Sequence, residues 1–470
     1  MLRDDVPVTH LRQLLRRAQR AGRRTGALVA MAALFAMLGP WPAASEVRSA
    51  EPEAVTVLAE RAVRAGLRVL TGERLVLATD RPMRDGDGIA ELPGVFDQAF
   101  DAWCRHYRLD PDRLGAWRAF GCLIVDRERF RAAGLLPDDV PAFVNGFCDR
   151  HRLWLADQSN AAYRRHLLLH EGVHAFTITV RDLAAPAWYM EGIAEHLATH
   201  RIEYDDGAPR FIPTPIPDRR GDAEQFGRIE ALRSLRVAGS SPSLADVFAQ
   251  SHGDHRALSA YAASWAAVTL LALHPAHANT FARLEQGPLA PDMNARLATL
   301  PGWDAVRASR DFDAFTQDVD YGYDVPRMAV DWSPGRPLRG EDRVEVDAAA
   351  GWQNTQIALE AGRTYGMEAT GRYRIGSLAD TPPGRTTILE SEADGISLRW
   401  YRGRMIGRLL VAQWREPDDA GRRPGFEVLA EGAAAEFTAL EDGTLYVRVN
   451  EAPGDLSDNV GGPSLRVSTR

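Results

Sequence analysis

One short pattern in the sequence has residue types and a spacing that could bind a metal ion and hydrolyse a bond. His170-Glu171-Gly172-Val173-His174 is an HExxH motif inside a segment with helical apolar spacing. Because positions i and i+4 lie on one face of a helix, both imidazoles could bind one Zn²⁺. Glu171, beside them, could act as the general base on zinc-bound water. The motif also arises by chance, so its surroundings decide its meaning.

A third ligand is expected from the next helix. A catalytic zinc site keeps three protein ligands and leaves one position open. Glu191 follows His174 with sixteen residues between them, in a helix predicted from Trp188 to His200 that begins after Pro186. Metzincins need a histidine at position 180, where this chain has valine. We therefore expect His170, His174 and Glu191 to hold zinc.

Several neighbouring polar residues allow other assignments. Glu195, one helical turn beyond Glu191, is the alternative third ligand and otherwise supports the site by hydrogen bonding. His166, one turn before the first motif histidine, is expected either to face solvent or to support the site, because a fourth protein ligand would close it. His196 and His200 are expected on the exposed face. A purely structural role for all these polar side chains stays open.

The two motifs together resemble the gluzincin metallopeptidases, in particular the peptidase MA-like group. In that group HExxH is followed by a W-x-x-E-G-x-A-E helix, as in Trp188–Glu195 here. Asn145–Leu155 is similar to the edge strand of the group, and Tyr261–Trp265 is similar to its Y-x-x-S-W helix. The resemblance covers roughly residues 120–280. It implies a zincin-like fold, zinc bound by the residues above, and peptide-bond hydrolysis.

The resemblance also suggests where a substrate would be held. Tyr261 could stabilise the oxyanion, although an aromatic side chain packed in the core fits equally well, and His252 and His255 could serve instead. A strand near Arg152–Ala156 would align a peptide by backbone hydrogen bonds. Gly172 replaces the usual large apolar residue, which either makes room beside the metal or marks a weaker constraint. The G-x-M-E-N sequence of aminopeptidases is missing, which favours an endopeptidase.

The elements that must position these residues form an α+β fold. Ordinary globular composition, 45% hydrophobic and 26% charged over 470 residues, excludes disordered, collagen-like and coiled-coil chains. Apolar spacing predicts helices over 54–70, 95–107, 163–181, 188–200 and 258–274, strands over 122–125 and 152–156, and a loop over 205–222. We assign residues 46–330 to a mostly helical metallopeptidase domain with a small mixed sheet.

The pattern changes after a turn-rich linker over 331–343. Short alternating runs, including 355–359, 364–369, 395–401, 405–411 and 443–449, predict an all-β sandwich over 344–470. Gly351–Leu359 and Gly443–Asn450 resemble bacterial galactose-binding lectin-like sandwiches. That resemblance implies Ca²⁺ and sugar binding near Asp455, Asp458 and Asn459, although Glu451 stands where aspartate is usual. Docking to a substrate or a cell surface is the alternative function that we favour for this domain.

The first 45 residues have the pattern of an export signal. They carry seven arginines and two aspartates, a net charge of +5, which leaves −13 for the rest of a chain whose total is −8. An uncharged stretch over 25–44 contains an apolar run over 27–38 that ends at Gly39-Pro40. An uncleaved membrane anchor is the alternative. The acidic remainder argues against a nucleic-acid partner.

These observations lead to two function hypotheses. The first is an exported, zinc-dependent endopeptidase acting on peptides or proteins, with possible docking to carbohydrate or a cell surface left to the C-terminal domain. The second is a zinc-binding or carbohydrate-binding cell-surface protein without catalytic activity. The spacings of Cys104, Cys122 and Cys148 match no metal site, and they allow either one disulfide or buried free thiols.

Overall fold

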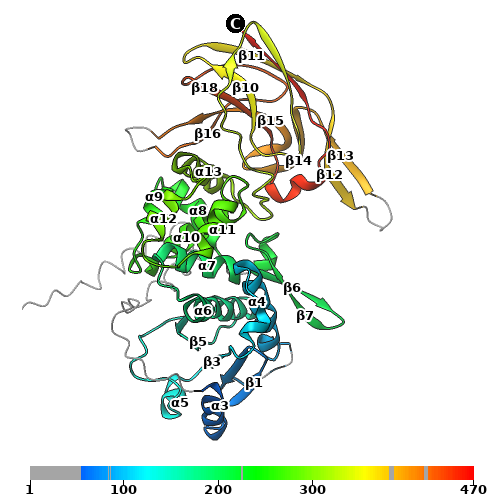
Figure 1. The fold of residues 1–470 in the computed structure, drawn as a ribbon. Coiled ribbons are helices and arrows are strands. Elements are labelled where there is room, and N and C mark those ends of the chain that lie inside the picture. The colour runs from blue at the N-terminus through cyan, green and yellow to red at the C-terminus, as the bar shows by residue number, and fades with distance from the viewer. Residues whose placement is uncertain (1–53, 83, 85, 224–225, 380–385, 418–421) are drawn as a thin grey trace, which may run out of the picture.

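The computed structural model describes residues 54–470 except 83, 85, 224–225, 380–385 and 418–421. The predicted signal segment, residues 1–45, lies outside this range. The described chain forms an N-terminal α+β region followed by a C-terminal all-β region (Figure 1). This arrangement confirms the fold class expected from the sequence.

A mixed five-stranded sheet forms one layer of the N-terminal region, in the order β1-β2-β3-β5-β4. Its strands are β1 (Arg68–Thr71), β2 (Leu75–Thr79), β3 (Ala119–Ile124), β4 (Gly146–Asp149) and β5 (Arg152–Ala156). Successive side chains of a strand point to opposite faces. Leu75 and Leu77 accordingly join the core shared with α4 and α6, whereas Val76 and Ala78 join a smaller core under α3 and α5. β4 is the edge strand, antiparallel to β5.

Helices make up most of the rest of this region. They are α3 (Val55–Arg64), α4 (Leu92–Tyr107), α5 (Arg127–Ala132), α6 (Ala161–Arg181), α7 (Ala187–Ala198), α8 (Arg228–Val237), α9 (Leu244–Phe248), α10 (Leu258–Leu273), α11 (Ala278–Gln286), α12 (Met293–Thr299) and α13 (Ala305–Asp318). α10 is buried along most of its length and packs against α7, α8, α11 and α13. It is therefore the central helix of the layer that faces α6 in Figure 1.

Two sequence expectations for this region were wrong. The segment 54–70 is helical only to Arg64, because Gly66, with a φ of +68°, turns the chain into strand β1. The segment 205–222, expected to be a loop, contains part of the hairpin formed by β6 (His200–Asp205) and β7 (Ala208–Pro213). Only His200 and Phe211 are buried in these two strands, so the strands lack the regular apolar alternation that would have revealed them.

The C-terminal region consists of two larger sheets packed around one core, with a separate hairpin. The sheets have the orders β14-β15-β18-β10-β8, with β16 paired to β15, and β17-β11-β19-β9. The strands are β8 (Arg336–Pro337), β9 (Glu341–Glu345), β10 (Gln353–Leu359), β11 (Thr364–Thr370), β12 (Tyr373–Ala379), β13 (Thr386–Ser391), β14 (Asp394–Tyr401), β15 (Arg404–Arg415), β16 (Gly425–Glu431), β17 (Ala434–Thr438), β18 (Gly443–Val449) and β19 (Ser464–Thr469). Residues from both sheets share the core.

Helix α13 carries much of the contact between the two regions (Figure 1). The Asp318 carboxylate accepts hydrogen bonds from Trp352 Nε1 at 2.9 Å, Arg402 Nη1 at 2.6 Å and Arg448 Nη1 at 3.0 Å. Trp352 and Arg448 are buried, so these charge-assisted bonds are shielded from water. The C-terminal region is thus joined to the helical layer through buried polar contacts.

A second contact comes from the 3₁₀ segment Pro453–Asp458 of the C-terminal region. Its Leu456 is fully buried within the core of the N-terminal region. Beside it, a Cβ at Gly322, whose φ is +72°, would lie 2.5 Å from the Cα of Gly454. Only glycine permits this backbone approach. Leu456 therefore belongs by packing to the region that precedes it in the chain.

The described residues also answer the question left open for cysteine. Cys104, Cys122 and Cys148 are all buried free thiols. Burial raises the pKa of Cys104 to about 11, so this thiol stays protonated at neutral pH. Within the described ranges, we find no helix whose length and apolar character would let it cross a membrane.

Candidate metal centre

Helix α6 carries the HExxH motif in its buried middle. The helix begins after Asn160, whose side chain accepts a hydrogen bond from the Tyr163 backbone N–H. Gly172 faces away from the motif histidines: a Cβ there would lie 2.5 Å from Phe96 and 2.8 Å from Trp103. Glycine at this position therefore allows α4 to pack closely against α6. It neither makes room for the metal nor marks a weak constraint.

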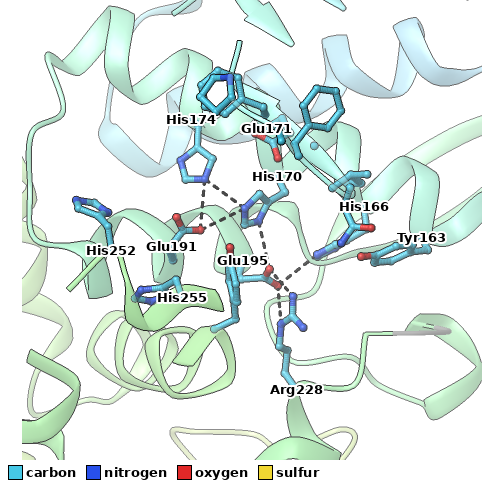
Figure 2. Close-up of a pocket in the computed structure, with 18 residues that line it drawn as sticks. Tyr163, His166, His170, Glu171, His174, Glu191, Glu195, Arg228, His252 and His255 are labelled. Atoms are coloured by element: carbon cyan, nitrogen blue, oxygen red, sulfur yellow. Dashed lines mark hydrogen bonds and ion pairs between the residues drawn. The ribbon is translucent and has the colours of Figure 1, made fainter. Parts of the chain in front are cut away.

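Helix α7 supplies the glutamates of the site. Pro186 precedes its first turn, as the sequence indicated. At Gly192 the helix touches α10 so closely that a Cβ would lie 2.5 Å from the Ser264 carbonyl oxygen. This contact explains the glycine of the E-G-x-A-E pattern. It brings α7 between α10 and α6, with Glu191 directed at the α6 histidines (Figure 2).

The structure brings the three predicted ligands together. His170 Nε2 lies 3.2 Å from His174 Nε2, and Glu191 Oε2 lies 3.4 Å from the first nitrogen and 3.5 Å from the second. All three side chains are buried. We call His170, His174 and Glu191 the metal centre, because this buried group could hold a metal ion.

The donor atoms fit zinc in both spacing and chemistry. Ligands about 2.0–2.1 Å from a tetrahedral zinc ion lie about 3.3 Å from one another. The three observed separations, 3.2, 3.4 and 3.5 Å, match this value. Glu191 Oε2 is fully buried and has no hydrogen-bond partner among the described residues, which is costly for an isolated carboxylate oxygen. A bound cation would satisfy it.

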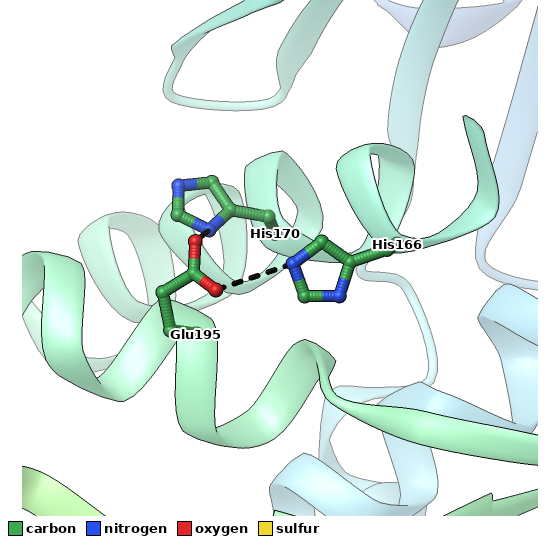
Figure 3. A group of neighbouring side chains, drawn as sticks. All are labelled: His166, His170 and Glu195. Carbon is green, nitrogen blue, oxygen red and sulfur yellow. Dashed lines mark ion pairs between the residues drawn. The ribbon is translucent and has the colours of Figure 1, made fainter. Parts of the chain in front are cut away.

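Glu195 supports the metal centre from the side opposite to Glu191. Its Oε1 lies 3.2 Å from His170 Nδ1, and its Oε2 lies 3.3 Å from His166 Nε2 (Figure 3). Arg228 donates to both carboxylate oxygens, from Nη2 at 2.6 Å and from Nε at 3.1 Å. A proton on His170 Nδ1 leaves Nε2 as the metal-binding atom. This geometry favours a supporting role for Glu195 and His166, as the sequence suggested.

Arg228 also decides whether a second ion could bind here. His166, His170 and Glu195 lie close enough to form a metal group of their own. The guanidinium of Arg228 already pairs with Glu195 through two hydrogen bonds and is 3% exposed. A cation added beside it would be repelled at close range. The arrangement therefore favours one ion at the site.

Glu171 projects from α6 next to the motif histidines and touches the edge strand β4. A Cβ at Gly146 would lie 2.5 Å from Glu171 Oε1, so the strand can approach only because this residue is glycine. Burial raises the pKa of Glu171 above its ordinary value, although His170 and His174 oppose this effect. A raised pKa suits a carboxylate that must accept and return a proton near neutral pH.

A pocket opens over these side chains. Its lining residues are Pro141, Ala142, Phe143, Asn145, Gly146, Phe147, Tyr163, His166, Leu167, His170, Glu171, His174, Glu191, Glu195, Arg228, His252, His255 and Tyr261. The predicted metal ligands and Glu171 thus share one cavity with the three candidate oxyanion donors (Figure 2).

The three candidate oxyanion donors have different surroundings. Tyr261 is 8% exposed and its ring centroid lies 6.2 Å from that of His170. His255 Nε2 lies 2.9 Å from Ser264 Oγ, so this histidine is engaged with α10. His252 is the most exposed of the three. Burial lowers its pKa, while the nearby Glu191 carboxylate opposes the shift.

Two expectations about the surroundings of the site were wrong. His196 and His200 are buried, 4% and 7% exposed, whereas the sequence favoured an exposed face. α10 covers His196, and Phe211 of β7 stacks on His200. The strand Arg152–Ala156 lies inside the sheet, so β4 offers the free edge beside the pocket.

Sequence reasoning missed Arg228 and the position of Gly146 beside Glu171. Arg228 begins α8, directly after a segment without apolar periodicity, so no motif pointed to it. Gly146 lay inside the segment recognised as resembling an edge strand, but its contact with Glu171 depends on how the sheet packs against α6. Neither residue carries a local signal of its role.

A second buried group of similar composition lies far along the chain from the motif. His274, His277 and Asp311 could hold a metal ion by residue type. His277 Nε2 donates to Asp311 Oδ2 at 2.7 Å, and Trp332 Nε1 donates to Asp311 Oδ1 at 2.7 Å. The Ala276 backbone N–H donates to His274 Nδ1 at 3.2 Å. We call His274, His277 and Asp311 the hydrogen-bonded cluster.

The acidic segment expected to bind calcium has buried oxygen atoms that could bind a cation, and an arginine close to them. Glu451 Oε1 and Asn459 Oδ1 are buried and have no hydrogen-bond partner among the described residues. Asn459 Nδ2 donates to Glu451 Oε2 at 2.9 Å, and burial raises the pKa of Glu451 to about 7. Arg399 lies 3.9 Å from Glu451 and 3.7 Å from Asp455, so the positive charge of its guanidinium group already lies near both carboxylates.

Comparisons with known proteins leave the family open. No protein-family description matches the chain, and no curated protein matches it. Among solved structures, the chain is similar to a PllA-like lectin, the EclA N-terminal domain, with 20% identity over 28% of this chain and 98% of that one, at a TM-score of 0.20. It is also similar to PliG of Aeromonas hydrophila, a periplasmic inhibitor of g-type lysozyme, with 10% identity over 29% and 96%, at a TM-score of 0.16.

Proposed function

We propose that the chain is an exported, zinc-dependent metallopeptidase of gluzincin type, acting as an endopeptidase on peptides or proteins. The observation that carries the proposal is the buried triangle of His170 Nε2, His174 Nε2 and Glu191 Oε2, with sides of 3.2–3.5 Å. Its third member comes from a second helix, so the match does not follow from the HExxH spacing alone. The pocket leaves this triangle accessible on one side.

The residues around the triangle have complementary roles in hydrolysis. Bound zinc would polarise the scissile carbonyl and acidify a water molecule. Glu171 accepts the proton of the attacking water and passes it to the leaving nitrogen. Glu195 holds the tautomer of His170, and Arg228 in turn fixes Glu195. The contacts of Glu195 with His170 and Arg228 support these proposed roles.

Strand β4 is the proposed binding edge for an extended substrate. It is the edge of its sheet, and Gly146 and Phe147 line the pocket next to Glu171. A peptide added antiparallel to this edge would bring its backbone carbonyls past the metal centre. Tyr261 and His252 are the proposed donors to the oxyanion, since both line the same pocket.

The proposal is tested by metal analysis combined with one substitution. We expect the purified full chain to contain about one equivalent of zinc and to cleave casein. Glu171→Gln should retain the zinc and reduce cleavage by at least roughly 100-fold, because a general base contributes that much. Glu60→Gln, at an exposed residue of α3, is the matched control and should leave cleavage unchanged.

Three other outcomes would count against the proposal. Zinc without cleavage in the wild-type chain would favour the inactive zinc-binding protein. Cleavage by Glu171→Gln at the wild-type rate would remove Glu171 from the mechanism. A chain that binds no zinc would overturn the metal assignment itself.

Calcium-dependent carbohydrate binding is a second candidate function, for the C-terminal region. The specific observation is the pair of buried oxygens, Glu451 Oε1 and Asn459 Oδ1, that have no hydrogen-bond partner among the described residues. The charges of Asp455 and Asp458 act on Glu451. Oxygen ligands of this kind suit Ca²⁺. Calcium-dependent retention on a galactose matrix, lost in Asn459→Ala, would support it. Retention that ignores calcium would leave surface docking as the function of this region.

A further inference from the structure

The back of helix α7, opposite the metal centre, carries a buried polar network. At 100° per residue, Tyr189 and His196 lie on nearly the same side of the helix, and Glu191 lies on the other. The Tyr189 hydroxyl donates to Glu285 Oε1 of α11 at 2.8 Å. His196 Nδ1 lies 3.0 Å from Thr269 Oγ1 of α10. These contacts attach the back of α7 to two neighbouring helices.

Glu285 is the centre of this network. Its Oε1 also lies 3.0 Å from His106 Nε2 of α4. Because Tyr189 gives its proton to Glu285, the Tyr107 hydroxyl, 3.0 Å away, must donate to Tyr189. A chain of hydrogen bonds thus runs from Tyr107 through Tyr189 to Glu285. Both tyrosines are nearly or fully buried and Glu285 is 6% exposed, so water cannot readily replace these bonds.

The network restrains the rotation of α7 about its own axis. The position of a metal ligand on α7 is most sensitive to this rotation. A rotation of about 10° moves an atom at the outer radius of a helix, about 6 Å, by about 1 Å. Metal–ligand distances tolerate only about 0.2 Å. Tyr189 is two residues before Glu191, so a bond fixed at its hydroxyl restrains the rotation of that turn directly.

We propose that Glu285 is a positioning residue for the metal centre. Through Tyr189 it fixes the rotation of α7 and, with it, the position of Glu191 relative to His170 and His174. The inference rests on the zinc site of the proposed function, and it does not require peptide hydrolysis.

The test compares zinc affinity with the stability of the metal-free protein, using the full chain. Zinc binding is measured by competition with a chelator, and the melting temperature is measured after metal removal. Glu285→Ala should weaken zinc binding by roughly 10–100-fold, the loss typical of groups that orient metal ligands. Glu285→Gln, which keeps an acceptor for Tyr189, should restore most of the affinity. Arg283→Ala, at an exposed residue of the same helix, is the control and should bind zinc normally.

Wild-type zinc affinity in Glu285→Ala, together with a lower melting temperature, would overturn the inference, since Glu285 would then support only the fold. If Glu285→Ala does not fold, Tyr189→Phe provides the same comparison, because it keeps the ring and removes the donated proton. A wild-type chain that binds zinc without cleaving peptides would defeat the proposed hydrolysis and leave this test intact. A wild-type chain that binds no zinc would overturn both.

Discussion

The metal centre and the hydrogen-bonded cluster use the same residue types and differ in what fills the space between them. Both consist of two histidines and one carboxylate, and all six side chains are buried. In the metal centre the donor atoms are 3.2–3.5 Å apart, and Glu191 Oε2 has no hydrogen-bond partner among the described residues. In the hydrogen-bonded cluster, the two carboxylate oxygens of Asp311 accept hydrogen bonds from His277 and Trp332, at 2.7 Å each.

The difference shows that composition and burial do not identify a metal site. A ligand nitrogen must present its lone pair to the ion, which requires the proton on the other ring nitrogen. His170 meets this condition, because its Nδ1 faces the Glu195 carboxylate. His274 does not, because its Nδ1 accepts a backbone N–H and its Nε2 must carry the proton when the ring is neutral. The hydrogen bonds within the hydrogen-bonded cluster therefore leave it unsuited to binding a metal ion.

The largest expected difference between the two groups is in zinc binding. His174→Ala should weaken zinc binding more than about 100-fold, since losing a ligand costs more than losing a group that orients one. His277→Ala, the matched substitution in the cluster, should leave both the zinc content and the zinc affinity unchanged. Competition with a chelator measures both variants. A second equivalent of zinc that disappears in His277→Ala would contradict the comparison.

Zinc removal should affect stability through the metal centre alone. An ion present at about 1,000 times its dissociation constant stabilises the folded state by about 4 kcal/mol. The melting temperature of the wild-type chain should therefore fall after chelation. The same treatment should lower the melting temperature of His174→Ala by less, because its weaker zinc binding contributes less stability. A similar fall in both proteins would show that the chelator acts elsewhere.

Disrupting the cluster should lower stability without touching the metal. Asp311→Ala leaves His277 and Trp332 without their acceptor, which typically costs about 1–3 kcal/mol in the free energy of unfolding. Denaturant unfolding of the zinc-loaded protein measures this loss. Zinc affinity in the same variant should equal that of the wild type, and a clear decrease would mean that the two groups are coupled.

The smallest expected effect is on pH dependence. Burial lowers the pKa of His274 to about 4, partly opposed by Asp311. In the unfolded chain the pKa is about 6.5. Between these values the unfolded state binds a proton that the folded state does not, so the free energy of unfolding falls as pH falls from about 6.5 to 4. His274→Gln should reduce this slope, and an unchanged slope in denaturant titrations would contradict the assignment.

The sequence was informative where chemistry and periodicity coincide. Apolar spacing predicts helices α6 and α7. The two motifs predict that Glu191 approaches the motif histidines, because such helices must pack their apolar faces together. Arg228 and Glu285 could not be found this way. Each reaches the site region from a distant element, and its role depends on tertiary packing that single-sequence patterns do not encode.

Errors at the strands have a similar origin. β6 and β7 contain only one buried residue each, so no regular alternation of apolar and polar residues marks them. β4 is four residues long and begins with glycine, which is unfavourable in isolated strands and is required here by the contact with Glu171. The burial of His196 and His200 could not be predicted from local sequence. It comes from α10, far away in sequence, and from β7, across a hairpin.

Leu456 has a consequence for how this protein can be divided. Its side chain fills a place in the N-terminal core, although it is encoded near the end of the C-terminal region. A shortened gene that ends after residue 330 would leave a void among apolar side chains, and a void of leucine size typically costs about 2–5 kcal/mol. Recombination that exchanged the β region for an unrelated partner would meet the same penalty. The two regions should therefore be inherited, expressed and engineered as a single unit.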